Sequence, residues 1–392
     1  MNAATIPVQR PHDAKLLVID AHGHFEHSER SRLPDFLRAG DLLVANDAAT
    51  LPASLIGVHQ RSGETIEVRL AGRRSLAMND VHEFSAIVFG PGDHRTRTED
   101  RAAPPALRAG DRLLLGPLQA TVLRLLDHPR LIALRFKGAA DRIRAGIARH
   151  GQPIQYAHVP QPLALWDVWT VVAARPVAFE PPSAGFVLDW RLLATLRARG
   201  VGFATLTHAA GISSTGDAAL DARLPFDEPY ELPVSTVEAI HRTRSNGGRV
   251  VALGTTVARA LEHAASKQLP LHAGPGVATQ RIGAHTALRV VDVLISGTHE
   301  PGSSHHDLLR AFANNAVLAR ADIALAQRGY RTHEFGDSVL IERARVPERT
   351  GRRAGPPQAR PAQGPRRGPC MAPGAVVAVT GVWGAPSTRA RT

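Results

Sequence analysis

The sequence predicts an α/β fold in which a small β-barrel-like domain interrupts a discontinuous α/β domain. Three observations predict this. Helix-like and strand-like patterns alternate over residues 151–343, short strand-like runs recur between 57 and 137, and Pro, Gly, Ala and Arg dominate from Val346 onward. Alternating elements are typical of α/β domains and closely spaced short strands of small barrels. The predicted parts are an α/β domain at 1–56 and 151–343, an inserted domain at 57–150, and a disordered tail at 344–392.

Residues 1–56 open the α/β domain. Residues 15–20 predict a short strand and 33–38 a helical turn. The apolar run that follows, from Asp41, predicts a buried strand that ends on two polar side chains, Asn46 and Asp47.

The inserted domain is predicted from short runs rich in β-formers, separated by Gly, Pro and Asp turns. These runs are 64–70, 83–89, 112–115, 120–126 and 131–136.

The second α/β segment continues the alternation. The predicted helices are 190–199, 235–245, 255–266, 307–319 and 321–328, and the predicted strands are 201–206, 249–253, 288–295 and 338–342. Ser235 followed by Glu238 has the spacing of a capping box, so Ser235 is the expected N-cap of its helix.

Composition excludes several protein classes. The 392 residues are 44% hydrophobic and 21% charged, as in a globular enzyme, and the single cysteine excludes an internal disulfide framework. No apolar run approaches the ~18–20 residues of a membrane span, and the first ten residues lack an apolar signal core, so a cytoplasmic location is expected. The net charge of +12 is weak evidence for nucleic acid, because residues 345–392 hold nine Arg against one Glu.

Two glycine-containing turns are candidate ligand sites. The strand at 249–253 runs into Gly254, Thr255 and Thr256 at a helix start, where free N–H groups suit a carboxylate or phosphate. The alternative is that Thr255 only caps its helix. The second turn, 181–185, contains Ser183 and Gly185 and lets a ligand approach the backbone, or is only a turn before a helix.

Histidines and acids supply the remaining candidates. His208 and His299 each come at a strand end, where open α/β sheets bind ligands. Glu228 falls in a loop flanked by prolines, and Asp292 in an apolar strand, where a carboxylate needs a partner. His22, His24 and His27 with Glu26 are too loosely spaced for a metal site, so no metal is expected.

Taken in order, these segments resemble the S-adenosylmethionine:tRNA ribosyltransferase-isomerase family of queuosine biosynthesis. Residues 37–53 (LRAGDLLVANDAATLPA) resemble its L-x-x-G-D-L-L-V-x-N motif, and 247–262 (GGRVVALGTTVARALE) its G-x-R-V-I-A-V-G-T-T segment. Residues 182–185, 228–233, 290–301 and 330–341 match further family segments, so the resemblance covers nearly 330 residues.

The resemblance implies a fold and an activity. The family fold is an α/β domain interrupted by a small β-barrel-like domain. Its enzymes move the ribosyl part of S-adenosylmethionine onto 7-aminomethyl-7-deazaguanine at the tRNA wobble position, which forms epoxyqueuosine and releases adenine and methionine. S-adenosylmethionine is the ribosyl-donor substrate, and no cofactor is implied. The expected partners are tRNA and S-adenosylmethionine, with a monomer expected and a homo-oligomer left open.

The resemblance also implies a site. The expected catalytic residues are His208, Glu228, Asp292 and His299. The expected substrate-binding residues are Asn46, Asp47, Ser183, Gly185, Gly254, Thr255, Thr256 and Arg259. The sulfonium acidifies the neighbouring C5′ protons, so one positioned base can begin the reaction. His208 or Glu228 is the expected base. The main-chain N–H groups after Gly254, together with Arg259, would bind the methionyl carboxylate.

Several loop residues depart from the family pattern. Ala49 and Ser54 stand where the family has Arg. Val187, Thr207 and Phe226 stand where it has His, and Gly297 and Thr298 replace its Asn and Phe. Two alternatives therefore stay open: a diverged paralogue with an S-adenosylmethionine-type pocket and another acceptor, or a non-catalytic RNA-binding protein. Loop arginines of the inserted module would either hold tRNA phosphates or be ordinary exposed side chains: Arg73, Arg74, Arg95, Arg97 and Arg101.

Overall fold

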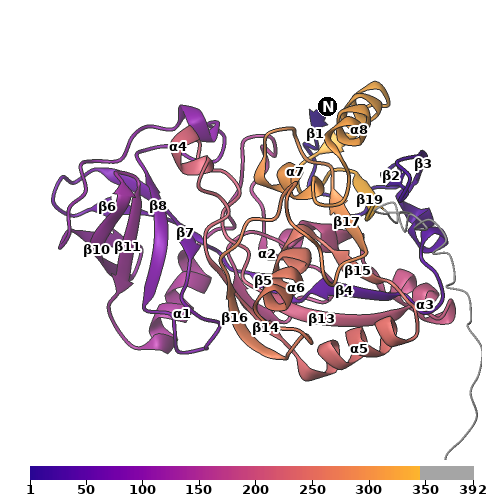
Figure 1. Ribbon diagram of the computed structural model, residues 1–392. Helices are drawn as coiled ribbons and strands as arrows, with labels where there is room; N and C mark the ends of the chain where they lie inside the picture. Colours follow the sequence, from indigo (N-terminus) through magenta and orange to yellow (C-terminus); the bar gives the residue numbers. More distant parts are fainter. Residues whose placement is uncertain (345–392) are drawn as a thin grey trace, which may run out of the picture. The chain divides into compact units, whose positions relative to one another are not determined.

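The computed structural model describes residues 1–344, so the predicted tail, apart from its first residue, lies outside the described residues. The described chain contains a nine-stranded mixed sheet and a closed six-stranded barrel (Figure 1). The predicted fold class, α/β with a β-barrel-like insertion, is confirmed.

The nine-stranded sheet has a parallel centre and antiparallel flanks. Strands β13, β4, β15 and β17 are parallel to one another, whereas β14 and β19 run antiparallel to their central neighbours. In spatial order the strands are β16 (Gly274–Ala278), β14 (Glu228–Leu232), β13 (Gly202–His208), β4 (Leu42–Asn46), β15 (Val250–Leu253), β17 (Val293–Gly297), β19 (Ser338–Glu342), β2 (Lys15–Ile19) and β3 (Phe25–Glu29).

The central strands are buried on both faces, as in other parallel sheets. Along β4, Leu42 and Val44 belong to one hydrophobic cluster, whereas Leu43 and Ala45 belong to another on the opposite face. Because side chains alternate along a strand, one apolar run supplies both layers. Helices α5 (Val234–Ser245) and α6 (Thr255–Lys267) pack in the first cluster, and the 3₁₀ helix η1 (Arg30–Phe36) and helix α3 (Trp190–Ala198) in the second.

Some predicted boundaries were wrong. Helix α5 has Pro233 as its N-cap, without a side-chain cap, so Ser235 lies inside the helix. The break predicted at residue 320 occurs earlier, between α7 (Ser304–Leu309) and α8 (Asn315–Gln327), where Asn314 caps α8. The remaining short elements are α2 (Leu165–Val168), α4 (Ala218–Asp221), the 3₁₀ helices η2 (Thr98–Asp100) and η3 (Ser183–Val187), and the strand pairs β1 (Asn2–Ala3) with β18 (Arg331–Thr332) and β5 (Ala48–Thr50) with β12 (Arg175–Ala178).

The barrel contains the five strands predicted for the inserted segment and one more. Its strands, in spatial order, are β10 (Leu118–His128), β11 (Leu131–Phe136), β8 (Glu83–Phe89), β7 (Thr65–Gly72), β6 (Ser54–His59) and β9 (Arg112–Leu115). The sixth strand, β6, begins upstream of the predicted boundary at 57 and pairs with both β7 and β9. Helix α1 (Ala140–His150) follows the barrel, and its Ile143 and Ile147 pack into the barrel core. The division of the chain into domains stays a prediction.

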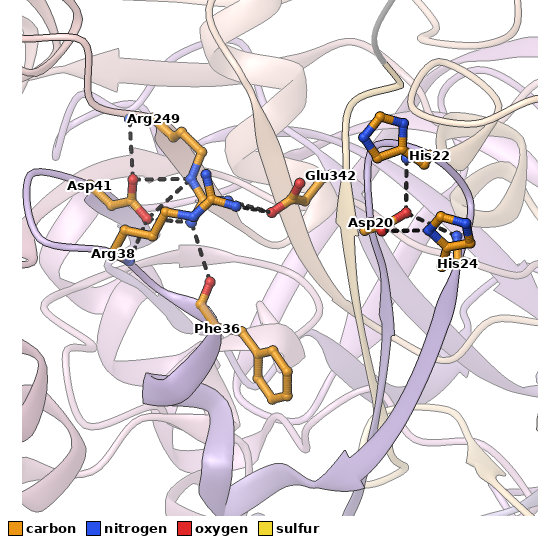
Figure 2. Close-up of polar contacts among 8 residues, drawn as sticks. All are labelled: Asp20, His22, His24, Phe36, Arg38, Asp41, Arg249 and Glu342. Carbon is orange, nitrogen blue, oxygen red and sulfur yellow. Dashed lines mark hydrogen bonds and ion pairs between the residues drawn. The ribbon is translucent and has the colours of Figure 1, made fainter.

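An ionic cluster ties the sheet together at the edge where the parallel strands begin (Figure 2). Arg249, just before β15, donates to both carboxylate oxygens of Asp41, just before β4, and to the main-chain oxygen of Phe36. It also donates to Glu342 at the end of β19. Asp41 is buried, so this pairing offsets the cost of removing its charge from water. Most of the candidate site residues lie at the opposite edge.

No helix in the part of the chain that the structure describes is long and apolar enough to cross a membrane.

Candidate functional site at the carboxyl edge of the sheet

The carboxyl ends of the parallel strands bring most of the predicted site residues to one edge of the sheet. β4 ends at Asn46, β13 ends at His208, β15 leads into Gly254, and β17 leads to His299. Because adjacent parallel strands end at the same edge, residues distant in sequence meet there. Glu228 joins them from the start of the antiparallel strand β14. This loop was predicted wrongly: residues 228–232 form a strand between β13 and β16.

Asn46 and Asp47 hold the strand ends in place. The Asn46 Nδ2 donates to the His208 main-chain oxygen at 2.9 Å, and the His208 N–H donates back to Asn46 Oδ1 at 3.0 Å. The Asp47 carboxylate accepts hydrogen bonds from Thr205 and Thr207 at 2.9 and 2.7 Å. Thr207, one of the departures from the family pattern, thus has a defined partner.

The centre of the site is a buried cluster of three ionisable side chains, His208, Glu228 and Arg259. The His208 Nε2 lies 3.4 Å from Glu228 Oε2, and within the described chain neither ring nitrogen of His208 has a hydrogen-bond partner. Glu228 accepts from the Gly211 N–H at 2.6 Å and from Arg259. Arg259 also donates to the main-chain oxygens of Phe226, Ala278 and Gln280, so in this structure it holds Glu228 in place.

Burial lowers the pKa of His208 to about 4, opposed by the charge of Glu228. Because the folded-state pKa lies below the ordinary value of 6.5, the unfolded chain binds a proton at His208 more readily than the folded protein does. This lowers the free energy of unfolding as the pH falls from 6.5 towards 4, and the effect is absent above pH 6.5. At ~1.4 kcal/mol per pKa unit, the loss is about 3 kcal/mol. We expect His208→Gln to flatten the pH dependence of the free energy of unfolding, measured by urea titration between pH 4 and 7. Parallel curves for the two proteins would contradict this.

Gly254 shapes the turn between β15 and α6. Its backbone has φ 101° and ψ 152°, a conformation open essentially to glycine alone. A Cβ there would lie 3.3 Å from the Ala184 Cβ, so this turn lies against the turn that contains Ser183 and Gly185. Among the described residues no side chain caps α6. Thr255 is therefore not the cap, and the N–H groups of the first turn of α6 suit an acidic group.

Two stacked histidines complete this edge. His299 stacks on His305 with ring centroids 4.8 Å apart, and its Nε2 lies 2.8 Å from Ser296 Oγ. His305 Nδ1 lies 2.9 Å from Thr255 Oγ1. Burial lowers the pKa of both imidazoles, so both rings are neutral near pH 7. Sequence reasoning did not select His305, because only the turn after β17 brings it back to the start of α6.

A pocket adjoins the turn at 181–185. The Tyr156 hydroxyl donates to Glu180, and burial raises the pKa of the Glu180 carboxyl to about 7. Tyr156, Glu180 and Pro181 line the pocket together with Ile154, Gln155, His158, Val159, Leu163, Val168, Glu334 and Phe335. Neither Tyr156 nor Glu180 was selected from the sequence, which carries no motif for them.

Asp292 lies at the opposite edge of the sheet, so the structure does not bring it together with the other predicted site residues. β17 begins at Val293, which places Asp292 before the strand rather than inside it. At ~3.3 Å per residue, the five-residue strand separates Asp292 from the site edge by about 17 Å. Its carboxylate instead accepts from the Val250 N–H at 3.0 Å and lies 3.3 Å from Arg343.

The histidines at the β2–β3 turn surround the carboxylate of Asp20. Asp20 accepts from the main-chain N–H groups of His22 and His24, and its second oxygen lies 2.9 Å from His24 Nδ1 (Figure 2). This is an exposed turn held by one carboxylate.

Several residues that depart from the family pattern either make hydrogen bonds to neighbouring residues or are buried. Ser54, which stands where the family has Arg, donates to Glu67 at 2.7 Å in the barrel wall, where Glu67 also pairs with Arg69 and Arg101. Thr298 donates to the main-chain oxygen of Arg331. Ala49 and Val187 are buried.

The loop arginines divide into two groups. Arg73 and Arg101 are buried and donate to main-chain oxygens of neighbouring turns, so they hold the barrel loops together. Arg74, Arg95 and Arg97 have side chains at least 67% exposed, and each pairs with a nearby acid. These three remain candidates for phosphate contacts.

Comparison with known proteins identifies the family. The family described as "Queuosine biosynthesis protein" matches residues 1–341. The S-adenosylmethionine:tRNA ribosyltransferase-isomerase of Gloeobacter violaceus is 34% identical, over 86% of this chain and 91% of the relative. That of Thermus thermophilus is 32% identical, over 84% of this chain and 92% of the relative.

A solved structure of S-adenosylmethionine tRNA ribosyltransferase from Thermotoga maritima matches 86% of this chain and 95% of its own, with 25% identity and a TM-score of 0.45. The family and the transferase-isomerase class predicted from the sequence are confirmed. The chain belongs to the queuosine biosynthesis family of S-adenosylmethionine:tRNA ribosyltransferase-isomerases.

Proposed function

We propose that this protein transfers and isomerises the ribosyl part of S-adenosylmethionine onto 7-aminomethyl-7-deazaguanine in tRNA, at the carboxyl edge of its sheet. The observation that carries the proposal is the buried His208–Glu228 pair, with Nε2 and Oε2 3.4 Å apart. A neutral imidazole can take a proton from C5′ next to the sulfonium, and the carboxylate beside it stabilises the imidazolium that forms. Arg259 donates to Glu228 and positions its carboxylate beside His208.

The donor is held by the two adjacent turns. The N–H groups at the start of α6, after Gly254, bind the methionyl carboxylate. Ala184 packs against Gly254, so the turn containing Ser183 and Gly185 forms the neighbouring wall. His299 and His305, stacked beside Thr255, are neutral donors or acceptors for the ribosyl hydroxyls. A cytoplasmic monomer that needs no cofactor remains our expectation.

The test uses the full chain with S-adenosylmethionine labelled in its ribosyl carbons and tRNA carrying 7-aminomethyl-7-deazaguanine. We expect label in the tRNA and equal amounts of adenine and methionine. Matched tRNA with guanine at the wobble position is the control and should accept no label. Adenine and methionine release that is independent of the modified tRNA would favour the paralogue with another acceptor. Retention of tRNA without consumption of the donor would favour a non-catalytic RNA-binding protein.

Residues 345–392 require a further control, because they carry a formal charge of +8 out of +12. Polyanion binding by such a segment is independent of sequence and falls steeply with salt. Truncation after Ala344 should therefore lower the affinity for unmodified tRNA while leaving the transfer of label intact.

A further inference from the structure

Three potential metal ligands meet beside the pocket, outside the His208–Glu228 site. His158, His333 and Glu334 each offer one ligand atom, and these atoms all lie within 4.8 Å of one another. His158 comes from the loop between α1 and α2, whereas His333 and Glu334 lie in the loop between β18 and β19. The two loops are far apart in the sequence, so only the fold brings these residues together.

The contacts within this group are close to those of a coordination shell. His158 Nε2 lies 2.9 Å from Glu334 Oε2, and the His158 and His333 rings stack with centroids 4.2 Å apart. A tetrahedral zinc ion with ~2.0–2.1 Å bonds places its ligand atoms about 3.3 Å apart. Of the three residues, only His333 is exposed. A change of its rotamer can therefore bring its ring nitrogen from within 4.8 Å of the other ligand atoms to the separation that a zinc ion requires.

The backbone is bent to bring two consecutive side chains onto His158. Successive residues of an extended chain point in opposite directions. His333 has φ +68°, in the left-handed region that non-glycine residues rarely adopt, and both its ring and the Glu334 carboxylate contact His158. Backbone strain of this kind recurs at ligand sites.

The surroundings suit a bound cation. Glu300 Oε1 lies 3.6 Å from His333 Nε2, and a carboxylate beside a ligating imidazole orients the ring. His158 and Glu334 also line the pocket that contains Tyr156 and Glu180. A cation held by three protein ligands would therefore keep one coordination position open towards the pocket, as catalytic zinc sites do.

We propose that His158, His333 and Glu334 form a binding site for one divalent transition-metal ion of the zinc type. Two imidazoles and a carboxylate favour zinc over the hard cations magnesium and calcium, which prefer oxygen ligands alone. The proposal does not rest on the proposed function, because its ligands lie outside the His208–Glu228 pair.

The test is a calorimetric titration of Zn²⁺ into the untagged full chain, without S-adenosylmethionine or tRNA. It is carried out in a Cys370→Ser background, because a thiol also binds zinc. We expect one ion per chain. His158→Ala and His333→Asn should each raise the dissociation constant about 100-fold or more, and Glu300→Gln about tenfold. His333→Asn tolerates the left-handed backbone and so separates loss of a ligand from loss of the fold.

The matched control is His241→Ala, which removes an exposed histidine on α5 and should change nothing. Cobalt supplies a second readout, since four-coordinate Co²⁺ absorbs visible light strongly and that band should disappear in the His158 and His333 variants. Sub-stoichiometric uptake, or equal dissociation constants in the parent and these variants, would overturn the proposal. Failure of label transfer to tRNA with zinc binding intact would reject the proposed function alone.

Discussion

Replacement of His208 by glutamine is expected to lower the turnover of S-adenosylmethionine by about 100- to 10,000-fold, the usual contribution of a general base. His208 is fully buried, its ring is neutral near pH 7, and Glu228 is its charged neighbour. Glutamine keeps much of the volume but cannot accept the proton. The loss should fall on kcat, whereas the affinity for S-adenosylmethionine, measured by calorimetry, should change little.

Two measurements separate a chemical role of His208 from a packing role. His241→Gln removes an exposed histidine from α5 and should keep the parent rate of adenine release. The pH profile of kcat should lose its acidic limb in His208→Gln, because the titrating group is gone. If turnover stays within about threefold of the parent while the fold is intact, His208 is not the proton acceptor and the stacked pair His299–His305 becomes the next candidate.

Strands were predicted well wherever an apolar run stood between strong turn signals. The strands at 83–89, 112–115, 131–136 and 338–342 occur as predicted. β14 was missed because Pro229 makes 228–232 look like a loop, and only its pairing with β13 and β16 shows it to be a strand. β6 was missed because Gly57 interrupts its apolar pattern and its two barrel neighbours decide its conformation.

The sequence predicts which residues lie at the strand ends, but not which loop residues fold back onto them. Polar residues at the ends of adjacent parallel strands share one edge of the sheet, and the structure brings Asn46 next to His208 and to Thr256 of the Gly254 turn at that edge. Asp292 is placed away from these residues because β17 begins at Val293, later than predicted, and an acid just before a parallel strand lies at the opposite edge of the sheet. His305 and the His158–His333 stack depend on long-range contacts between loops, which no local pattern contains.

Replacement of Arg259 by methionine is expected to lower the free energy of unfolding strongly, because it breaks the buried Glu228–Arg259 ion pair. Both side chains are less than 10% exposed, and Arg259→Met would leave the Glu228 carboxylate without its cation. Breaking a buried pair on one side costs about 3–5 kcal/mol. We expect a loss of this size in the free energy of unfolding, measured by urea titration. Arg242→Met is the matched control on α5, because its pair with Glu238 is more than 60% exposed and should contribute less than about 1 kcal/mol.

The double variant Glu228→Gln/Arg259→Met distinguishes stability from positioning. Replacing both members of a buried ion pair by neutral residues is often close to neutral, so part of the lost stability should return, while the main-chain oxygens that Arg259 bonded stay unpaired. Turnover should nevertheless stay low, because the carboxylate next to His208 is absent and nothing stabilises the imidazolium. If turnover recovered together with stability, Glu228 and Arg259 would serve the fold alone, and proton transfer at His208 would not need its carboxylate neighbour.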